Sequence, residues 1–222
     1  MDGRADCARC REIQRQSTSG VRVNDITVCI ATIPPRREHL ERALASVTRQ
    51  TLQPASIVVE YDHDRTGAAA TKNRALDKVT TAWTAFLDDD DEFLPHHLER
   101  IRDCAETTGA DVVYPIPRVP RYESGRDPMG RYGVPFDEAE LRRRSYIQTT
   151  TLVRTELFKK AGGFQLPKDF PGCPFDDWGA WLALLDVGAK FVHLPEETFI
   201  WNHWGMGRPG VPGNTSGMAS RW

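Results

Sequence analysis

The sequence predicts an α/β domain with a mostly parallel central sheet flanked by helices. Short apolar runs rich in β-branched residues alternate with amphipathic segments of helical spacing, which is the pattern of repeated β-α-β units. Polar and acidic residues follow several of these runs, where the carboxyl ends of parallel strands bind ligands. The chain has 222 residues, which is enough for one large domain.

The first half of the chain carries the clearest alternation. Four strands are expected, at 26–33, 56–61, 82–87 and 111–116, each an apolar run. Helices are expected between them, after Pro34-Pro35, from Gly67 to Val79, and from Pro95 to a stop at Gly109. Because helices separate consecutive strands, these four strands are predicted to be parallel.

The second half is less regular. Residues 117–145 are rich in proline, glycine and arginine, so we expect an insertion loop there, serving as a flap or acceptor loop. Beyond it the pattern predicts a strand at 149–153, a helix at 154–161, a turn at Gly162-Gly163, a helix from Asp176, and strands at 190–194 and 198–201.

Composition and charge exclude several classes of protein. Lys and Arg total 29 against 31 Asp and Glu, so the net charge of -2 argues against a polybasic nucleic-acid binder. No apolar run approaches the roughly 20 residues of a membrane span, and the N-terminus lacks a secretory signal, so we expect a cytoplasmic protein without a transmembrane segment. We expect a disordered tail at 1–24, a folded domain at 25–204 and a flexible, glycine-rich tail at 205–222.

The cysteines do not suggest a disulfide framework. Their number, five, is odd, and three of them lie far apart in the sequence. Cys7 and Cys10 form a single CxxC, which we interpret as two reduced thiols; half of a zinc site completed by His96 and His97 or by another chain is the alternative.

The strongest chemical signal is the segment FLDDDDEF. Four aspartates and Glu92 follow a strand apolar enough to be central. Adjacent carboxylates repel one another, and the end of a buried strand tolerates this poorly unless a cation neutralises them. Oxygen ligands of this kind suit Mg²⁺, Mn²⁺ or Ca²⁺, so we favour a metal site over a solvated acidic turn.

Two further motifs carry charged residues at the starts of helices. Asp176-Asp177-Trp178 opens an amphipathic helix, and from the residues alone helix capping explains it most simply. Lys72-Asn73-Arg74 lies in the first turns of an earlier helix, where Lys72 fits equally well as a phosphate contact or as a salt-bridge partner of Asp90 or Asp91.

The order of these motifs resembles the family-2 glycosyltransferases of the GT-A fold. ATIPPR, VVEYD with GAAATKNRAL, FLDDDD, a GGF turn and FDDW occur in the family's order across about residues 25–204. The resemblance implies a single Rossmann-like GT-A domain, with a nucleotide-binding half at 25–116 and an acceptor and catalytic half at 146–204. It also implies a metal-dependent, inverting transfer of a sugar from a nucleotide-diphosphate donor, a UDP-sugar foremost, to a hydroxyl of a soluble acceptor.

The resemblance also implies roles for individual residues. Asp177 would be the catalytic base, with Asp176 as the second choice. Asp90, with Asp88 and His203, would bind Mn²⁺ or Mg²⁺ on the donor diphosphate. The remaining nucleotide contacts would be Thr32, Pro34, Arg36, Glu60, Asp62, Lys72, Asn73, Asp88 and Asp89. Of the two acids that end the second strand, Asp62 is preferred over Glu60 for reading the base.

Other functions use the same residues. A nucleotidyltransferase would need the carboxylates too, although enzymes of that class carry a glycine-rich loop after the first strand and ATIPPRRE has no glycine. A non-catalytic nucleotide- or sugar-binding module would need Asp90 but not Asp177. The acceptor, whether protein, nucleic acid, nucleotide or glycan, and the oligomeric state are left open.

Overall fold

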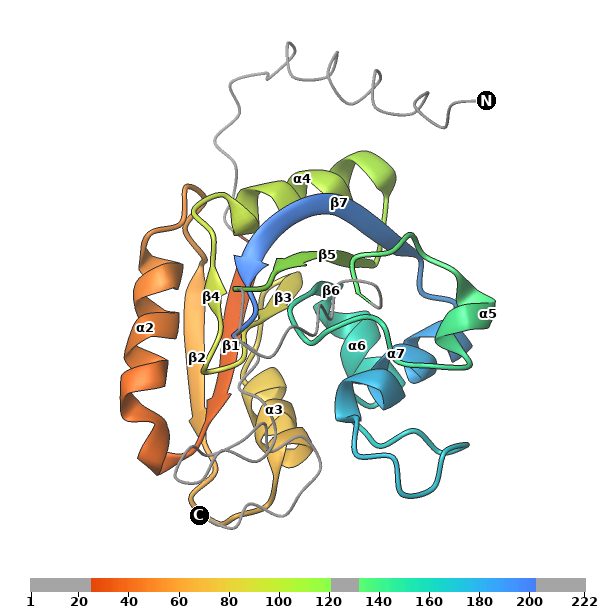
Figure 1. The fold of residues 1–222 in the computed structure, drawn as a ribbon, viewed down its shortest axis with the longest axis horizontal. Helices are drawn as coiled ribbons and strands as arrows, with labels where there is room; N and C mark the ends of the chain where they lie inside the picture. Colours follow the sequence, from red (N-terminus) through yellow and green to blue (C-terminus); the bar gives the residue numbers. More distant parts are fainter. Residues whose placement is uncertain (1–24, 121–131, 203–222) are drawn as a thin grey trace.

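A strongly curled seven-stranded sheet forms the centre of the protein in the computed structural model, which describes residues 25–120 and 132–202 (Figure 1). Its strand order is β2-β1-β3-β6-β5-β7-β4. The strands are β1 (Ile26–Thr32), β2 (Ser56–Tyr61), β3 (Trp83–Phe86), β4 (Glu92–Phe93), β5 (Val112–Arg118), β6 (Leu152–Arg154) and β7 (Phe191–Ile200).

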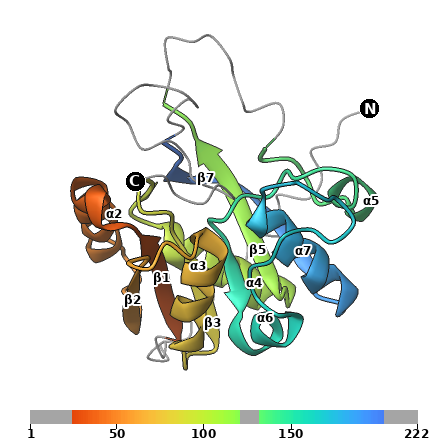
Figure 2. The same cartoon turned by 90° about the horizontal axis from the view of Figure 1, so that it is seen from below.

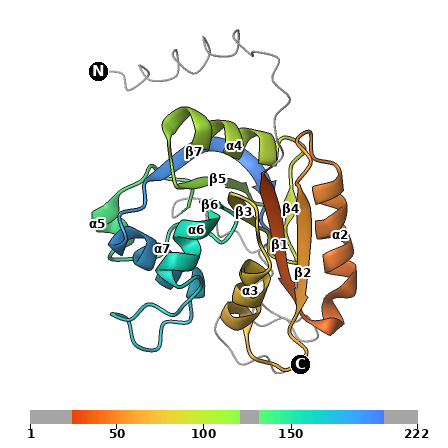
Figure 3. The same cartoon turned by 180° about the vertical axis from the view of Figure 1, so that it is seen from behind.

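Helices cover both faces of this sheet. They are the short 3-10 helix η2 (Pro34–Arg36) and the α-helices α2 (Arg37–Thr48), α3 (Ala68–Asp77), α4 (His97–Thr108), α5 (Glu138–Leu141), α6 (Thr155–Ala161) and α7 (Asp176–Asp186). In Figures 1 and 3, α2 and α4 lie on one side of the sheet and α3, α6 and α7 on the other. None of the helices in the described part of the chain is long and apolar enough to cross a membrane.

Two apolar clusters hold the layers together. One packs the sheet against α3, α6 and α7 and contains the fully buried side chains of Phe158 and Trp181. The other packs the opposite face against α2 and α4 and contains Ile101. Successive residues of a strand point to opposite faces, so Cys29 belongs to the first cluster and Ile30 to the second. The continuous apolar run of β1 therefore reflects burial on both faces.

The parallel half of the sheet agrees with the prediction from sequence. β1 pairs in parallel with β2 and with β3, and Cys29 lies level with Val58 on one side and Phe86 on the other. The helices between these strands also occur where expected. α4 ends at Gly109, whose φ of 66° is the left-handed conformation that glycine adopts at little cost.

The sheet beyond β3 contains an antiparallel strand. β5 points the same way as β3, as expected, but β6 lies antiparallel between them. The chain leaves β5 at the carboxyl edge, and the segment that follows returns at that same edge, so the next strand runs the opposite way. Sequence alternation could not reveal this, because α5, the helix described between β5 and β6, has only four residues and the three-residue strand β6 carries no periodicity.

Three smaller features also differ. The two strands expected at 190–194 and 198–201 form one strand, β7, whose pairing with β5 shifts register around Ile116. β4 has only two residues, too few to produce a pattern, and pairs with the end of β7. Within the expected insertion loop, β5 extends to Arg118 and α5 forms at 138–141, capped by the Asp137 side chain.

The carboxyl ends of β1, β2 and β3 meet at one edge of the sheet. Asp62, just after β2, donates its backbone N–H to the Thr32 carbonyl oxygen (2.8 Å), and Leu87, just after β3, donates to that of Cys29 (3.1 Å). The residues expected to bind ligand therefore follow strands that end side by side. In Figure 2, which views the protein from below, α3 lies in front of the parallel strands, with α6 and α7 beside it.

Candidate active site

The four aspartates after β3 alternate between two environments. Asp89 is buried and receives the Thr32 hydroxyl at Oδ2 (2.6 Å) and the Arg36 guanidinium at Oδ1 (2.6 Å). Asp91 is also buried and accepts the backbone N–H of Asn202 (2.8 Å). Thr32 and Arg36, expected to contact the nucleotide, thus fasten the end of β1 to the end of β3.

Asp88 and Asp90 are the members of this cluster that remain open to a ligand. Their side chains are 38% and 14% exposed. Burial and the neighbouring aspartates raise the pKa of Asp90 to about 7 despite Arg36, whose Nη1 lies 3.5 Å away. Burial also raises the pKa of Asp88, although the charge of Lys72 opposes this. A positive charge added nearby would stabilise the ionised form of both carboxylates.

These two side chains fit a divalent cation by their chemistry. Carboxylate oxygens are the ligands that Mg²⁺ and Mn²⁺ prefer, and a cation would offset the burial and the repulsion that raise both pKa values. Across residues 25–120 and 132–202, no three His, Cys, Asp or Glu side chains gather closely enough to hold a metal by themselves. The third expected ligand, His203, lies outside the described residues.

Lys72 joins this cluster to the start of α7. It projects from α3, is buried, and places Nζ 3.3 Å from Asp176 Oδ2 and 3.9 Å from Asp88 Oδ1. The ring of Phe164 lies on its other side, with its centroid 4.8 Å from Nζ. These carboxylates raise the pKa of Lys72 in spite of its burial, so the ammonium stays charged. Its ion-pair partners therefore differ from the expected Asp90 and Asp91.

Asp176 and Asp177 open α7 beside Lys72. Asp176 is buried, and its Oδ1 accepts the backbone N–H of Asp177 (3.1 Å). Asp177 is half-buried, and its Oδ1 accepts the backbone N–H of Trp178 (2.7 Å). Burial and the adjacent Asp176 raise the pKa of Asp177 to about 7, with Lys72 acting in the opposite direction. A carboxyl group that titrates near neutral pH is suited to accept a proton.

The start of α7 is fixed by close backbone approaches. The side-chain amide of Asn73 donates to the Phe164 carbonyl oxygen and accepts its N–H, both at 2.8 Å. A side chain on Gly163 would collide with Asn73, and one on Gly179 would collide with the backbone of Gln165. Asn73 thus anchors the GGF turn to α3, and its expected contact with the nucleotide stays a prediction.

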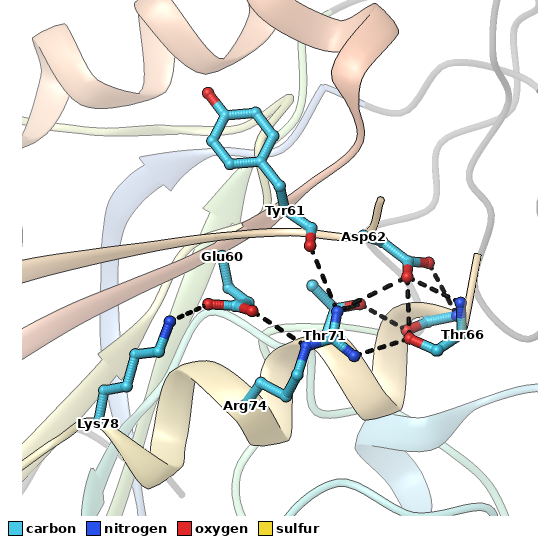
Figure 4. Close-up of polar contacts among 8 residues, drawn as sticks. Glu60, Tyr61, Asp62, Thr66, Thr71, Arg74 and Lys78 are labelled. Atoms are coloured by element: carbon cyan, nitrogen blue, oxygen red, sulfur yellow. Dashed lines mark hydrogen bonds and ion pairs between the residues drawn. The ribbon is translucent and has the colours of Figure 1, made fainter. Parts of the chain in front are cut away.

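Asp62 is engaged in a capping arrangement at the β2–α3 corner (Figure 4). Its Oδ1 accepts the N–H and the hydroxyl of Thr66, and its Oδ2 accepts the N–H of Gly67, all at 2.8 Å. These hydrogen bonds outweigh the effect of burial and lower the pKa of Asp62. The carboxylate orders the loop that leads into α3, and its expected contact with the base stays a prediction.

Glu60 belongs to the same corner. It forms ion pairs with Lys78 and with Arg74, whose Nε lies 3.0 Å from Oε1. The hydrogen bond from Lys78 is the main cause of its lowered pKa. Figure 4 shows Glu60 and Asp62 turned toward α3, with the ring of Tyr61 on the opposite side of the strand. The structure thus brings Thr32, Arg36 and the β3 aspartates together with Lys72 and Asp176. The side chains of Glu60 and Asp62 turn away toward α3, although the Asp62 backbone lies against Thr32.

Some residues escaped prediction, and one predicted residue is simply exposed. Asn202 supplies two hydrogen bonds to the aspartate segment, the second from Nδ2 to the Asp90 carbonyl oxygen (2.8 Å). Only its position in WNHW, after the last expected strand, could have suggested this. Arg74, the third residue of the KNR motif, pairs with Glu60, a contact that the motif alone does not indicate. Pro34 lies exposed in η2, and its predicted contact with the base is not tested by the geometry.

The family model for glycosyl transferase family 2 matches residues 42–166, more than half of the chain. No curated protein sequence matches. Residues 42–166 run from α2 to the segment just before α7, so the matched region includes the β3 aspartates, Lys72 and the GGF turn.

Solved structures share the fold. The crystal structure of S. aureus TarS 1-349 in complex with UDP has 16% sequence identity and a TM-score of 0.62, over 80% of this chain and 60% of that one. The complex of TarS 1-349 with UDP-GlcNAc has 14% identity and a TM-score of 0.62, over 84% of this chain and 60% of that one. The chain thus spans about 60% of the length of TarS 1-349, and the likeness confirms the predicted GT-A fold. With this fold and the family model in agreement, the chain belongs to glycosyl transferase family 2.

Proposed function

We propose that this protein is a metal-dependent, inverting glycosyltransferase that moves a sugar from a UDP-sugar to a hydroxyl of a soluble acceptor. One observation carries the proposal. Lys72 contacts both Asp88, at the end of β3, and Asp176, beside Asp177 at the start of α7. A candidate donor-binding carboxylate and the residue next to the candidate base thus share one buried cation in a chain of glycosyl transferase family 2.

The donor half of the proposal rests on Asp88 and Asp90. Both carboxylates are held at the end of a buried strand, open to a ligand, with raised pKa values. A divalent cation held by them would offset the charge that develops on a diphosphate leaving group. The guanidinium of Arg36, with Nη1 3.5 Å from Asp90, would also help to stabilise the negative charge on the diphosphate. The UDP and UDP-GlcNAc in the TarS crystals favour uridine donors for this chain as well.

The acceptor half rests on Asp177. Its half-buried carboxylate would take the proton from the acceptor hydroxyl as the oxygen attacks the anomeric carbon on the face opposite the diphosphate. The bond to the diphosphate oxygen breaks as the new glycosidic bond forms, and the single displacement inverts the anomeric configuration. Asp176, already paired with Lys72, is occupied by that contact.

A ligand-binding measurement tests the donor half. Thermal melts with UDP, GDP, TDP and CDP, each with and without Mn²⁺, should show stabilisation by UDP that depends on the metal. A ligand at about 100 times its dissociation constant adds roughly 2.7 kcal/mol to the free energy of unfolding, which a melt resolves easily. Stabilisation by the metal alone, with no nucleotide response, would contradict a donor site.

A transfer assay then tests the acceptor half. UDP-sugars are offered with small glycans, nucleotides, RNA and peptides, and UDP release above hydrolysis reports transfer. Asp177→Asn should keep the UDP-dependent stabilisation and lose transfer by about 100-fold or more, as expected for loss of a general base. If Asp177→Asn transferred sugar at the unmodified rate, Asp177 would not be the base. If the unmodified protein bound UDP but transferred no sugar, it would be a binding module.

A further inference from the structure

Lys72 connects two parts of the candidate active site that are far apart in the sequence. Its Nζ lies 3.3 Å from Asp176 Oδ2, in a pair separated by 104 residues, and 3.9 Å from Asp88 Oδ1. The lysine and Asp176 are both buried, and the Phe164 ring covers the ammonium. An ion pair that is shielded from water in this way is stronger than one in water, and this strength holds the two side chains in place.

The contact between Lys72 and Asp176 reaches Asp177 in two ways. Asp176 accepts the backbone N–H of Asp177 through Oδ1, so the ion pair orients the first turn of α7. The ammonium also acts on Asp177 through space. Within the described residues, the charged side chains that act electrostatically on Asp177 are Asp176 on its own helix, Lys72 on α3 and Asp88 at the end of β3. Lys72 alone among these three opposes the burial and repulsion that favour a protonated Asp177.

We propose that Lys72 is a positioning residue that keeps Asp177 placed and ionised for proton acceptance, through Asp176 and through its own charge. This inference rests on the proposed role of Asp177 as the base. The lysine does not take or give a proton in the reaction. It supplies the positive charge that lets a half-buried carboxylate remain an anion near neutral pH.

The test follows the Asp177 carboxyl directly and does not depend on activity. Aspartate carboxyl carbons are labelled with ¹³C in the ligand-free, full-length protein, and the Asp177 signal is assigned as the one lost in Asp177→Asn. Lys72→Met, which keeps the length of the side chain and removes the charge, should move the titration midpoint up by roughly one pH unit. Lys72→Arg should restore most of the difference.

A matched control separates charge from general loss of a lysine. Lys159 on α6 donates from Nζ to the Val79 carbonyl oxygen (2.7 Å), so Lys159→Met also removes a lysine contact, here between α6 and the segment after α3. Its Asp177 midpoint should equal that of the unmodified protein. In the transfer assay, the acidic limb of the pH–rate profile should move to higher pH in Lys72→Met. It should stay at the same pH in Lys159→Met.

A second pair of variants protects the test if Lys72→Met does not fold, since that change leaves Asp176 buried without its cation. The double variant Lys72→Met with Asp176→Asn is compared with Asp176→Asn alone, and its midpoint should again be the higher. Equal midpoints in both comparisons would overturn the proposal. A shifted midpoint in a protein that transfers no sugar with any donor would support the electrostatic link and overturn the proposed function.

Discussion

The end of β3 and the β2–α3 corner use the same residue types in opposite ways. At the corner, Glu60 and Asp62 receive cations and backbone N–H groups, and their pKa values are lowered. At the end of β3, burial and mutual repulsion raise the pKa values of Asp88, Asp90 and Asp91. The corner carboxylates are already neutralised by the fold itself. Those after β3 are held in an unfavourable state, which a bound cation would relieve, and this difference separates structural acids from candidate functional ones.

The largest expected effect comes from Asp90→Asn at the end of β3. Transfer should fall by about 100-fold or more, because one of the two carboxylates proposed to hold the cation loses its charge. The melting temperature at pH 8 should not fall, since the change removes a repelled, mostly buried charge. Initial rates and thermal melts measure both, with Glu92→Gln in β4 as the neighbouring control. An Asp90→Asn protein with normal metal-dependent transfer would break the comparison.

The corner should respond to Asp62→Asn with a loss of stability. The amide cannot accept all three hydrogen bonds from Thr66 and Gly67, so one buried donor is left facing an NH₂ group. The free energy of unfolding should fall by about 2 kcal/mol in a urea titration. The exposed Asp64 in the same loop provides the control Asp64→Asn, which should change stability little. A stable Asp62→Asn protein that no longer responds to UDP would move Asp62 from the structural to the functional group.

Stability should depend on pH in a way that distinguishes the two regions. A carboxyl with a raised pKa in the folded state contributes stability at low pH that is lost as pH rises, here between about 4 and about 7 for Asp90. Replacing Asp90 with Asn removes this loss. The melting temperature of Asp90→Asn minus that of the unmodified protein should therefore increase by several degrees between pH 5 and pH 8. Thermal melts in metal-free buffers measure the gap. A gap that is constant with pH would contradict the raised pKa.

The smallest effect is expected from Lys78→Met at the corner. Lys78 is more than half exposed, and exposed ion pairs contribute less than about 1 kcal/mol. The free energy of unfolding should change by no more than that, and the UDP-dependent stabilisation and the transfer rate should be retained. If nucleotide stabilisation disappeared, the ion pair with Glu60 would have to be part of the donor site.

Local patterns explain why much of the fold was predictable. The apolar runs of β1, β2 and β3 and the helical spacing of α2, α3 and α4 arise from burial of one or both faces of each element. The acidic cluster at the end of β3 was also identifiable as a candidate site, because a row of acids after a buried strand is unfavourable without a compensating charge. These features depend on neighbours in the sequence.

Features that depend on distant residues were not predictable. The antiparallel insertion of β6 follows from where the chain returns after β5, and three residues carry no signal of direction. Lys72 was expected to contact a phosphate or to pair with Asp90 or Asp91, and its ion pair with Asp176, 104 residues away, has no signal in the local sequence.

The position of β6 has a consequence for how the chain assembles. Val153 lies level with Thr84 of β3 on one side and Val112 of β5 on the other, so three residues bridge the β1–β3 half and the β5–β7 half of the sheet. During synthesis, the facing edges of β3 and β5 cannot acquire this partner until residue 154 has emerged. Such late, long-range pairing slows folding and exposes strand edges to aggregation. The cooperativity of the whole domain therefore depends on one of its shortest strands.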